Sequence, residues 1–110
     1  ASAVTPAPVR AVRINGLTTP PFAFKKTGFR KGRAVAFKVT NVDFLTHNFT
    51  IYYGKLRAPK GKPIAKTRDL DPNQTSKPVR VVFPKAGTYT VFCTIPGHEQ
   101  TMQLRFTVAP

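Results

Sequence analysis

The sequence is most informative between Phe83 and Met102, where it reads Phe83-Pro-Lys-Ala-Gly-Thr-Tyr-Thr-Val-Phe-Cys-Thr-Ile-Pro-Gly-His-Glu-Gln-Thr-Met102. A Pro-Lys-Ala-Gly turn signal is followed by an alternating run that predicts a β-strand with one face on a core. The end of the run brings a thiol, an imidazole and a thioether, from Cys93, His98 and Met102, into ten residues. Because the whole chain has one Cys, one Met and two His, chance is a poor explanation of this grouping.

The other histidine, His47, opens a second alternating run, which extends to Tyr53. His47 shares parity with the apolar Phe49 and Ile51, so we expect its side chain to point inward from the end of a strand, as Cys93 does from another. Two imidazoles, a thiolate and a weak thioether are the donors of blue-copper electron-transfer sites. Structural zinc sites, the main chemical competitor, normally use four Cys or His ligands and no Met.

Alternation with a period of two dominates the rest of the chain and predicts an all-β fold. It recurs over residues 35–40, 79–83 and 103–108, while eleven Pro and seven Gly separate the runs. We expect seven or eight short strands packed as a two-sheet antiparallel sandwich. Residues 54–77 lack this pattern and predict a long crossover with at most one short strand. A chain of 110 residues has room for one domain, 1–110, with residues 1–8 as a loose N-terminal lead.

The run from 83 to 102, with its Cys-x4-His-x3-Met spacing, resembles the C-terminal signature of the cupredoxins, the type 1 blue copper proteins. The spacing is similar to that of azurin-like members and longer than the Cys–His step of plastocyanin-like ones. The resemblance implies a Greek-key β-sandwich that holds one type 1 copper ion. It implies His47, Cys93 and His98 as in-plane ligands and Met102 as the axial ligand.

The resemblance also implies a supporting shell around the thiolate. Asn48 is expected to brace the Cys loop by hydrogen bonding near Thr94, and the backbone N–H groups of Asn48 and Ile95 are expected to point toward the sulfur. Uncharged loop residues around the edge of His98 form a candidate docking patch for a redox partner: Phe44, Leu45, Ile95 and Pro96.

The net charge of +14 is unusual, and it is unevenly placed along the chain. Basic blocks span residues 25–38 and 55–68, whereas residues 39–54 and 86–104, which hold the four candidate ligands, contain no Lys or Arg. The charge fits an acidic docking surface on a redox partner, or an anionic membrane surface. Nucleic-acid binding, with strongly salt-dependent affinity, is expected as a side effect only.

These observations predict a small soluble one-electron carrier. We expect it to be a monomer whose partners are other redox proteins. Copper storage or delivery is the alternative, although delivery proteins usually offer several Met or Cys ligands. Enzyme activity is not expected, because the oxidases need further His-bound copper ions and both histidines are already used. No transmembrane segment or signal peptide is visible, and the small-residue, Pro-rich lead resembles that of a processed chain. We therefore expect an extracytoplasmic location, in the periplasm or at the cell exterior, with association to membranes through charge.

Overall fold

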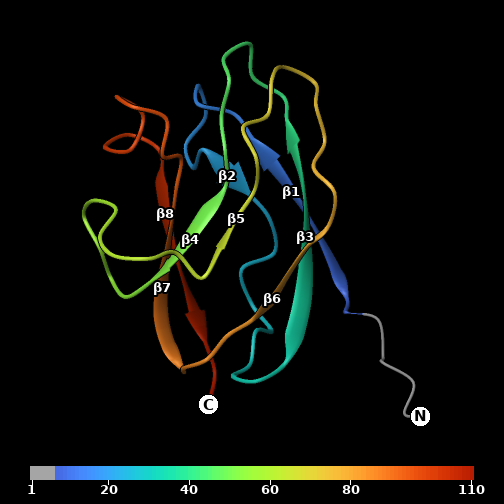
Figure 1. Cartoon of the computed structure of the whole chain (residues 1–110), viewed down its shortest axis with the longest axis vertical. Helices are drawn as coiled ribbons and strands as arrows, with labels where there is room; N and C mark the ends of the chain where they lie inside the picture. The colour runs from blue at the N-terminus through green and yellow to red at the C-terminus, as the bar shows by residue number, and fades with distance from the viewer. Residues whose placement is uncertain (1–6) are drawn as a thin grey trace.

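Two four-stranded sheets form a β-sandwich in the computed structural model, which describes residues 7–110 (Figure 1). The first sheet has the order β2-β1-β3-β6 and the second β5-β4-β7-β8. The strands are β1 (Val9–Ile14), β2 (Phe22–Ala23), β3 (Ala34–Asn41), β4 (Thr50–Tyr53), β5 (Ala65–Lys66), β6 (Val79–Val82), β7 (Gly87–Phe92) and β8 (Gln103–Val108). The predicted all-β sandwich is confirmed, and the part of the chain described here has no helix long and apolar enough to cross a membrane.

One pairing departs from the antiparallel sandwich that the alternation predicted. Strands β1 and β3 pair in parallel, with Val9 opposite Ala36 and Ile14 opposite Asn41. Residues 15–33, which include the edge strand β2, make the connection that a parallel pair requires. All the other neighbouring strands pair antiparallel.

The core lies between the inner faces of the two sheets and is rich in aromatic rings. Phe37 from the first sheet, and Tyr89 and Phe106 from the second, are almost fully buried. Rings from neighbouring elements meet edge to face, as in Phe24 against Phe37 at 5.9 Å between centroids. The inward parity read from the sequence therefore describes the core side of both sheets.

The outer face of the second sheet is also buried, which the simple alternation does not predict. Tyr52, Thr90 and Phe92 point away from the core, yet each is buried. The crossover after β4 lies against this face, because the N–H of Leu56 donates to the Thr90 hydroxyl at 3.1 Å and the Arg105 guanidinium donates to the Leu56 carbonyl at 2.7 Å. As expected, the crossover carries one short strand, β5.

The N-terminal strands were not among the predicted runs. In β1 the inward-facing Val12 lies between Ala11 and Arg13, so the outward positions are partly apolar. The alternation of apolar and polar residues that marks a strand is therefore weak here. Of the expected lead, residues 1–6 lie outside the described residues, and the carbonyl of Pro8 already accepts a hydrogen bond from the Ala36 N–H at 2.8 Å.

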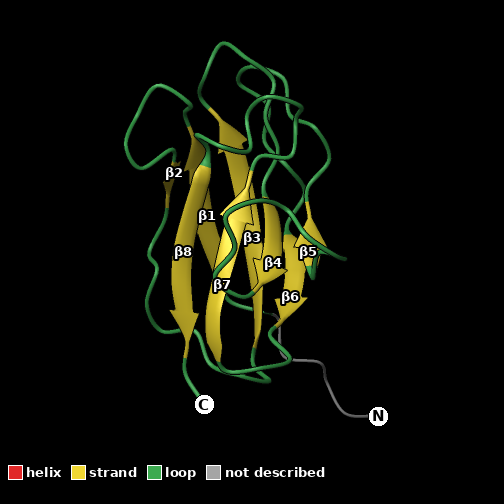
Figure 2. Ribbon diagram, turned by 90° about the vertical axis from the view of Figure 1, so that its left-hand side faces the viewer, coloured by secondary structure: helices red, strands yellow, loops and turns green. Residues whose placement is uncertain are grey.

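The strands run along the long axis of the molecule, and their ends define two poles (Figure 2). Loops 42–49, 67–78 and 93–102 gather at one end, at the top of Figure 1, which we call the metal pole. The C-terminus and the turns before β3 and β7 lie at the opposite end. All four candidate ligands belong to the loops of the metal pole.

Candidate metal centre

Two of the candidate ligands are held by backbone pairing at strand ends. His47 precedes β4 and forms an antiparallel bridge with Leu70, whose N–H donates to the His47 carbonyl at 2.7 Å. Cys93 follows β7 directly, and its N–H donates to the Met102 carbonyl at 3.2 Å. These backbone hydrogen bonds fix the main chain at both positions.

His98 stands in a tight turn between Cys93 and Met102. Its N–H donates to the Ile95 carbonyl at 2.9 Å, and its own carbonyl accepts from the Met102 N–H at 2.9 Å. The backbone φ of Gly97 is +90°, a value that residues with a side chain rarely adopt. The glycine of the Pro-Gly step therefore allows this turn. The turn folds His98 back over Cys93.

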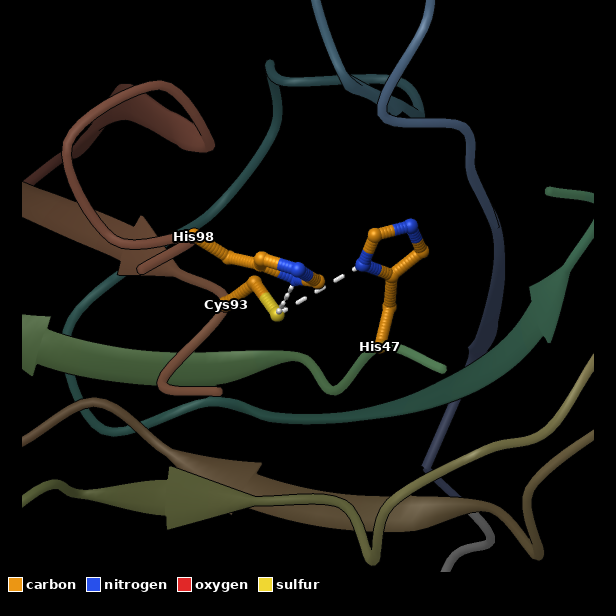
Figure 3. Close-up of side chains that lie close together, drawn as sticks. All are labelled: His47, Cys93 and His98. Atoms are coloured by element: carbon orange, nitrogen blue, oxygen red, sulfur yellow. Dashed lines mark hydrogen bonds between the residues drawn. The ribbon is translucent and has the colours of Figure 1, made fainter. Parts of the chain in front are cut away.

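Three donor atoms converge in the resulting site (Figure 3). The Sγ of Cys93 lies 3.7 Å from the Nδ1 of His47 and 3.7 Å from the Nδ1 of His98. The ligand atoms of the three residues all lie within 4.8 Å of one another. Bonds of about 2.0 Å to nitrogen and about 2.3 Å to sulfur, at a trigonal angle, separate the two donors by about 3.7 Å. The spacing fits one metal ion held between the sulfur and the two nitrogens.

A buried carboxylate lies behind the His47 ring. The Nε2 of His47 is 2.6 Å from the Oδ2 of Asp43, and both side chains are 1% exposed. With Nε2 donating to the carboxylate, Nδ1 keeps its lone pair for a metal, the arrangement that orients many metal-binding histidines. Asp43 was not among the site residues predicted from the sequence.

The Asp43 carboxylate is itself fully supported. Its Oδ2 accepts from the Gly16 N–H at 2.9 Å and its Oδ1 from the Phe44 N–H at 2.7 Å. Burial raises the pKa of Asp43, but the hydrogen bonds from His47, Gly16 and Phe44 outweigh it, so the pKa lies below its ordinary value. The carboxylate is therefore charged at neutral pH.

Gly16 allows this close approach of the backbone. A Cβ at residue 16 would lie 2.9 Å from the Asp43 Oδ2 and 3.3 Å from the His47 ring. One sequence signal could have indicated the contact between Asp43 and His47, because Asp43 is the only charged residue in the stretch 39–54. No local signal links Gly16 to it.

The thiol of Cys93 is fully buried and faces two backbone donors. Burial raises its pKa, and the charges of Asp69 and Glu99 add to that effect, whereas the N–H groups of Asn48 and Ile95 oppose it. A bound cation strongly favours the thiolate over the thiol. The two N–H groups point to the sulfur as the resemblance implied.

Asn48 ties the His47 segment to the Cys93 loop. Its Oδ1 accepts from the Thr94 N–H at 2.9 Å, and its Nδ2 donates to the Thr94 hydroxyl at 3.0 Å and to the Asp69 carboxylate at 3.0 Å. Asn48 is 1% exposed. This side chain therefore holds together two ligand segments that are 46 residues apart in the chain.

The remaining predicted residues lie at the same pole with different exposure. Met102 is buried and belongs to the same core cluster as Cys93. Of the candidate docking patch, Phe44 and Leu45 are 68% and 46% exposed, Pro96 is exposed, and Ile95 is half-buried against the core. His98 is half-buried, unlike His47, so its ring is the ligand nearest to solvent.

No family model and no curated protein sequence matches this chain. Among solved structures, it is similar to auracyanin A, a "blue" copper protein from the green thermophilic photosynthetic bacterium Chloroflexus aurantiacus, with 24% identity, a TM-score of 0.70 and coverage of 91% of this chain and 98% of that one. Auracyanin B matches with a TM-score of 0.78, 23% identity and coverage of 99% and 94%. Reduced rusticyanin matches with a TM-score of 0.66, 24% identity and coverage of 91% and 77%.

Larger proteins match as well. A multicopper oxidase from Pediococcus acidilactici has a TM-score of 0.64 and 17% identity over the whole of this chain, which covers 28% of the oxidase. The two auracyanins and rusticyanin are matched over most of their length, and the oxidase over one part of it. The architecture, the strand order and these likenesses together show that the chain has the cupredoxin fold, with a candidate type 1 copper site at the metal pole.

Proposed function

We propose that this protein is a one-electron carrier that holds a single type 1 copper ion between His47, Cys93 and His98, with Met102 as the axial ligand. The observation that carries the proposal is the 3.7 Å spacing of the Cys93 sulfur from both imidazole Nδ1 atoms. Copper in such a donor set accepts and releases one electron, and a thiolate with a weak thioether is the set that electron-transfer sites use. The structural likeness to auracyanin A, a "blue" copper protein, supports the assignment.

The protein's own contribution is to hold the ligands still. The Leu70 bridge fixes the backbone of His47, Asp43 fixes its ring, and Asn48 fixes the Cys93 loop. Little ligand movement between oxidation states favours fast electron exchange. Electrons are proposed to pass through the half-buried His98 at the metal pole, where Phe44 and Leu45 are also exposed.

We further propose that the protein acts as a monomer, outside the cytoplasm, with other redox proteins. An acidic partner surface would have to engage cations on the flanks, because the carboxylates of Asp69 and Asp71 lie at the metal pole itself. A separate enzyme activity is not proposed. Both histidines of the chain lie in one site, so none is left for the additional His-bound copper ions that oxidases need.

The test is a copper titration of the metal-free protein followed by visible absorption and redox titration. We expect one copper ion per chain, an intense thiolate-to-copper band and reversible bleaching on reduction. Cys93→Ser should remove the band, while a variant that stays intensely blue would contradict the ligand assignment. A pale protein that readily gives up Cu(I) to a chelator would favour copper storage or delivery instead.

A further inference from the structure

The acidic side chains of this chain are confined to one end of its long axis, whereas basic side chains occur at both ends, with Arg68 and Lys77 in the metal-pole loop 67–78. All of its carboxylate side chains lie at the metal pole, where they hydrogen-bond to residues of the candidate site or adjoin it: Asp43, Asp69, Asp71 and Glu99. The molecule is 44 Å long and 27 by 22 Å across. The end opposite the metal pole therefore carries no acidic side chain.

That opposite end is densely cationic. We call it the basic pole and define it by the following side chains: Arg10, Lys25, Lys26, Arg30, Lys31, Arg33 and Lys85. They come from the start of β1, from the connection between β2 and β3, which runs down to the bottom of Figure 1, and from the turn before β7 at that end. Backbone bonds join these segments, since the N–H of Gly32 donates to the Phe83 carbonyl at 3.0 Å and that of Lys31 to the Ala109 carbonyl at 2.8 Å.

The surface of the basic pole is concave. A hollow of about 610 Å³ lies between the β2–β3 connection and the end of β8, and its basic lining residues are Lys26, Arg30, Arg33 and Arg105. A smaller hollow of about 160 Å³ adjoins it, shares Arg30 and Arg33 with it and adds Arg10. No carboxylate lines either one, and the described residues contain no ion pair at this end.

One of these cations is held in place without an acidic partner. The guanidinium of Arg10 donates to the Lys25 carbonyl at 2.6 Å and lies 4.5 Å from the centre of the Phe29 ring. These contacts order the side chain but leave its charge uncompensated. The two hollows therefore present several positive charges to an approaching ligand, and the charge of Arg10 is held in one position.

We propose that the basic pole docks on an anionic phospholipid membrane, with lipid phosphate groups entering the two hollows. Guanidinium groups form charge-assisted, often bidentate hydrogen bonds with phosphate. Each basic residue close to an anionic bilayer also adds to the free energy of membrane binding. The cations that line the two hollows lie close together and have no acidic side chain among them.

Other polyanions fit this surface less well. Single-stranded nucleic acid is normally bound on exposed aromatic rings, and Phe29 is buried beneath the hollows. A protein interface normally has a large apolar or aromatic anchor. In the described part of the chain, the exposed large hydrophobics at this end are Val9, Val82 and Tyr53, and the Lys85 ammonium lies over the Tyr53 ring at 4.9 Å.

Docking in this way leaves the metal pole facing away from the lipid. If the proposed function holds, a soluble redox partner can then reach His98 while the protein stays on the membrane. Binding itself does not depend on copper, so it can be measured on the metal-free protein. Failure of the copper site and failure of membrane docking are thereby separate results.

The experiment is flotation of the full chain, metal-free, with vesicles of phosphatidylcholine alone or of equimolar phosphatidylcholine and phosphatidylglycerol. The test variant is K26Q/R30Q/R33Q, and the matched control is R57Q/K60Q/K62Q, which removes the same charge from the crossover after β4. We expect binding to the anionic vesicles only. The test variant should bind on the order of a hundredfold more weakly, and the control variant much less so. Circular dichroism of each variant establishes that it is folded.

Several results would overturn the proposal. Absence of binding to anionic vesicles at low salt is one, and equal losses in the two triple variants is another, because charge alone would then explain the affinity. Binding of inorganic phosphate without binding of vesicles would indicate a free anion as the ligand. Tighter binding of single-stranded DNA than of vesicles at the same salt, lost in the test variant, would indicate a nucleic-acid surface.

Discussion

The Nε2 of His47 lies 2.6 Å from the Oδ2 of Asp43, with both side chains buried. The ring that offers Nδ1 to the metal centre is therefore held from its other side by a negative charge. A carboxylate that accepts this hydrogen bond raises the basicity of the imidazole as a ligand. It also favours the more highly charged oxidation state of a bound metal, because opposite charges attract strongly in a buried site.

Replacing Asp43 separates the effect of charge from that of the hydrogen bond. Asp43→Asn keeps an acceptor for His47 but removes the charge, so we expect the reduction potential of the copper-loaded protein to rise. Asp43→Ala also leaves the buried Nε2–H of His47 without a partner. It should therefore lower the free energy of unfolding by about 1–3 kcal/mol more than Asp43→Asn does. Redox titration and urea unfolding measure the two effects.

Asp71→Asn is the matched control, because Asp71 is exposed at the same pole and its carboxylate accepts from the Thr46 hydroxyl. It removes the same charge without touching a ligand. We expect a much smaller change of potential than in Asp43→Asn. Equal changes in the two variants would show that only the net charge of the pole matters.

Gly16 should not tolerate a side chain while Asp43 is present. Gly16→Ala would place a Cβ 2.9 Å from the Asp43 carboxylate, and overpacking of this kind costs about 1–3 kcal/mol. We expect this loss in urea unfolding of the metal-free protein. In an Asp43→Ala background the clash with the carboxylate is gone, so the cost of Gly16→Ala should shrink. Strictly additive costs would contradict the contact.

Asn48 should stabilise the Cys93 loop more than its partner's side chain does. Asn48→Ala removes the acceptor of the buried Thr94 N–H and both Nδ2 donations, whereas Thr94→Ala keeps the backbone bond to Asn48. We expect Asn48→Ala to cost about 1–3 kcal/mol of unfolding free energy and to speed copper loss to a chelator. Thr94→Ala should have a smaller effect on both. The reverse order would show that the hydroxyl is the brace.

Many of the strands could be predicted because apolar and polar side chains alternate along short stretches of the sequence. The runs that became β3, β6, β7 and β8 each have one apolar side that faces the core, so their existence could be predicted. The parallel pairing of β1 with β3 could not, because alternation fixes which face is buried but not which strand lies alongside. Burial of Thr90 on the outer face depends on a crossover whose own sequence is irregular.

The candidate site divides in the same way. Cys93 and His98 are five residues apart, so their spacing in the chain already limits how they can be arranged. The contact of Gly16 with Asp43 spans 27 residues and joins two loops. No periodic pattern relates loop positions to one another, which is why the supporting carboxylate emerged only from the three-dimensional structure.

Tyr89 ties the turn before β7 to the core at the basic pole. Its hydroxyl donates to the Lys85 carbonyl at 2.7 Å and accepts from the Lys85 N–H at 3.2 Å, while the side chain is fully buried. Tyr89→Phe should therefore cost about 1 kcal/mol of unfolding free energy at neutral pH. Urea unfolding of the metal-free protein measures this loss.

The same residue should make the protein sensitive to alkali. Burial raises the pKa of Tyr89, and Tyr53 adds to this effect, whereas the Lys85 N–H opposes it. The unfolded chain releases the phenol proton from about pH 10, while the folded state still retains it. Stability from Tyr89 is thus complete below about pH 10 and falls as the pH rises toward the higher pKa of the folded state. The difference in unfolding free energy between wild type and Tyr89→Phe should narrow over that range, and a constant difference would show that the phenol does not contribute.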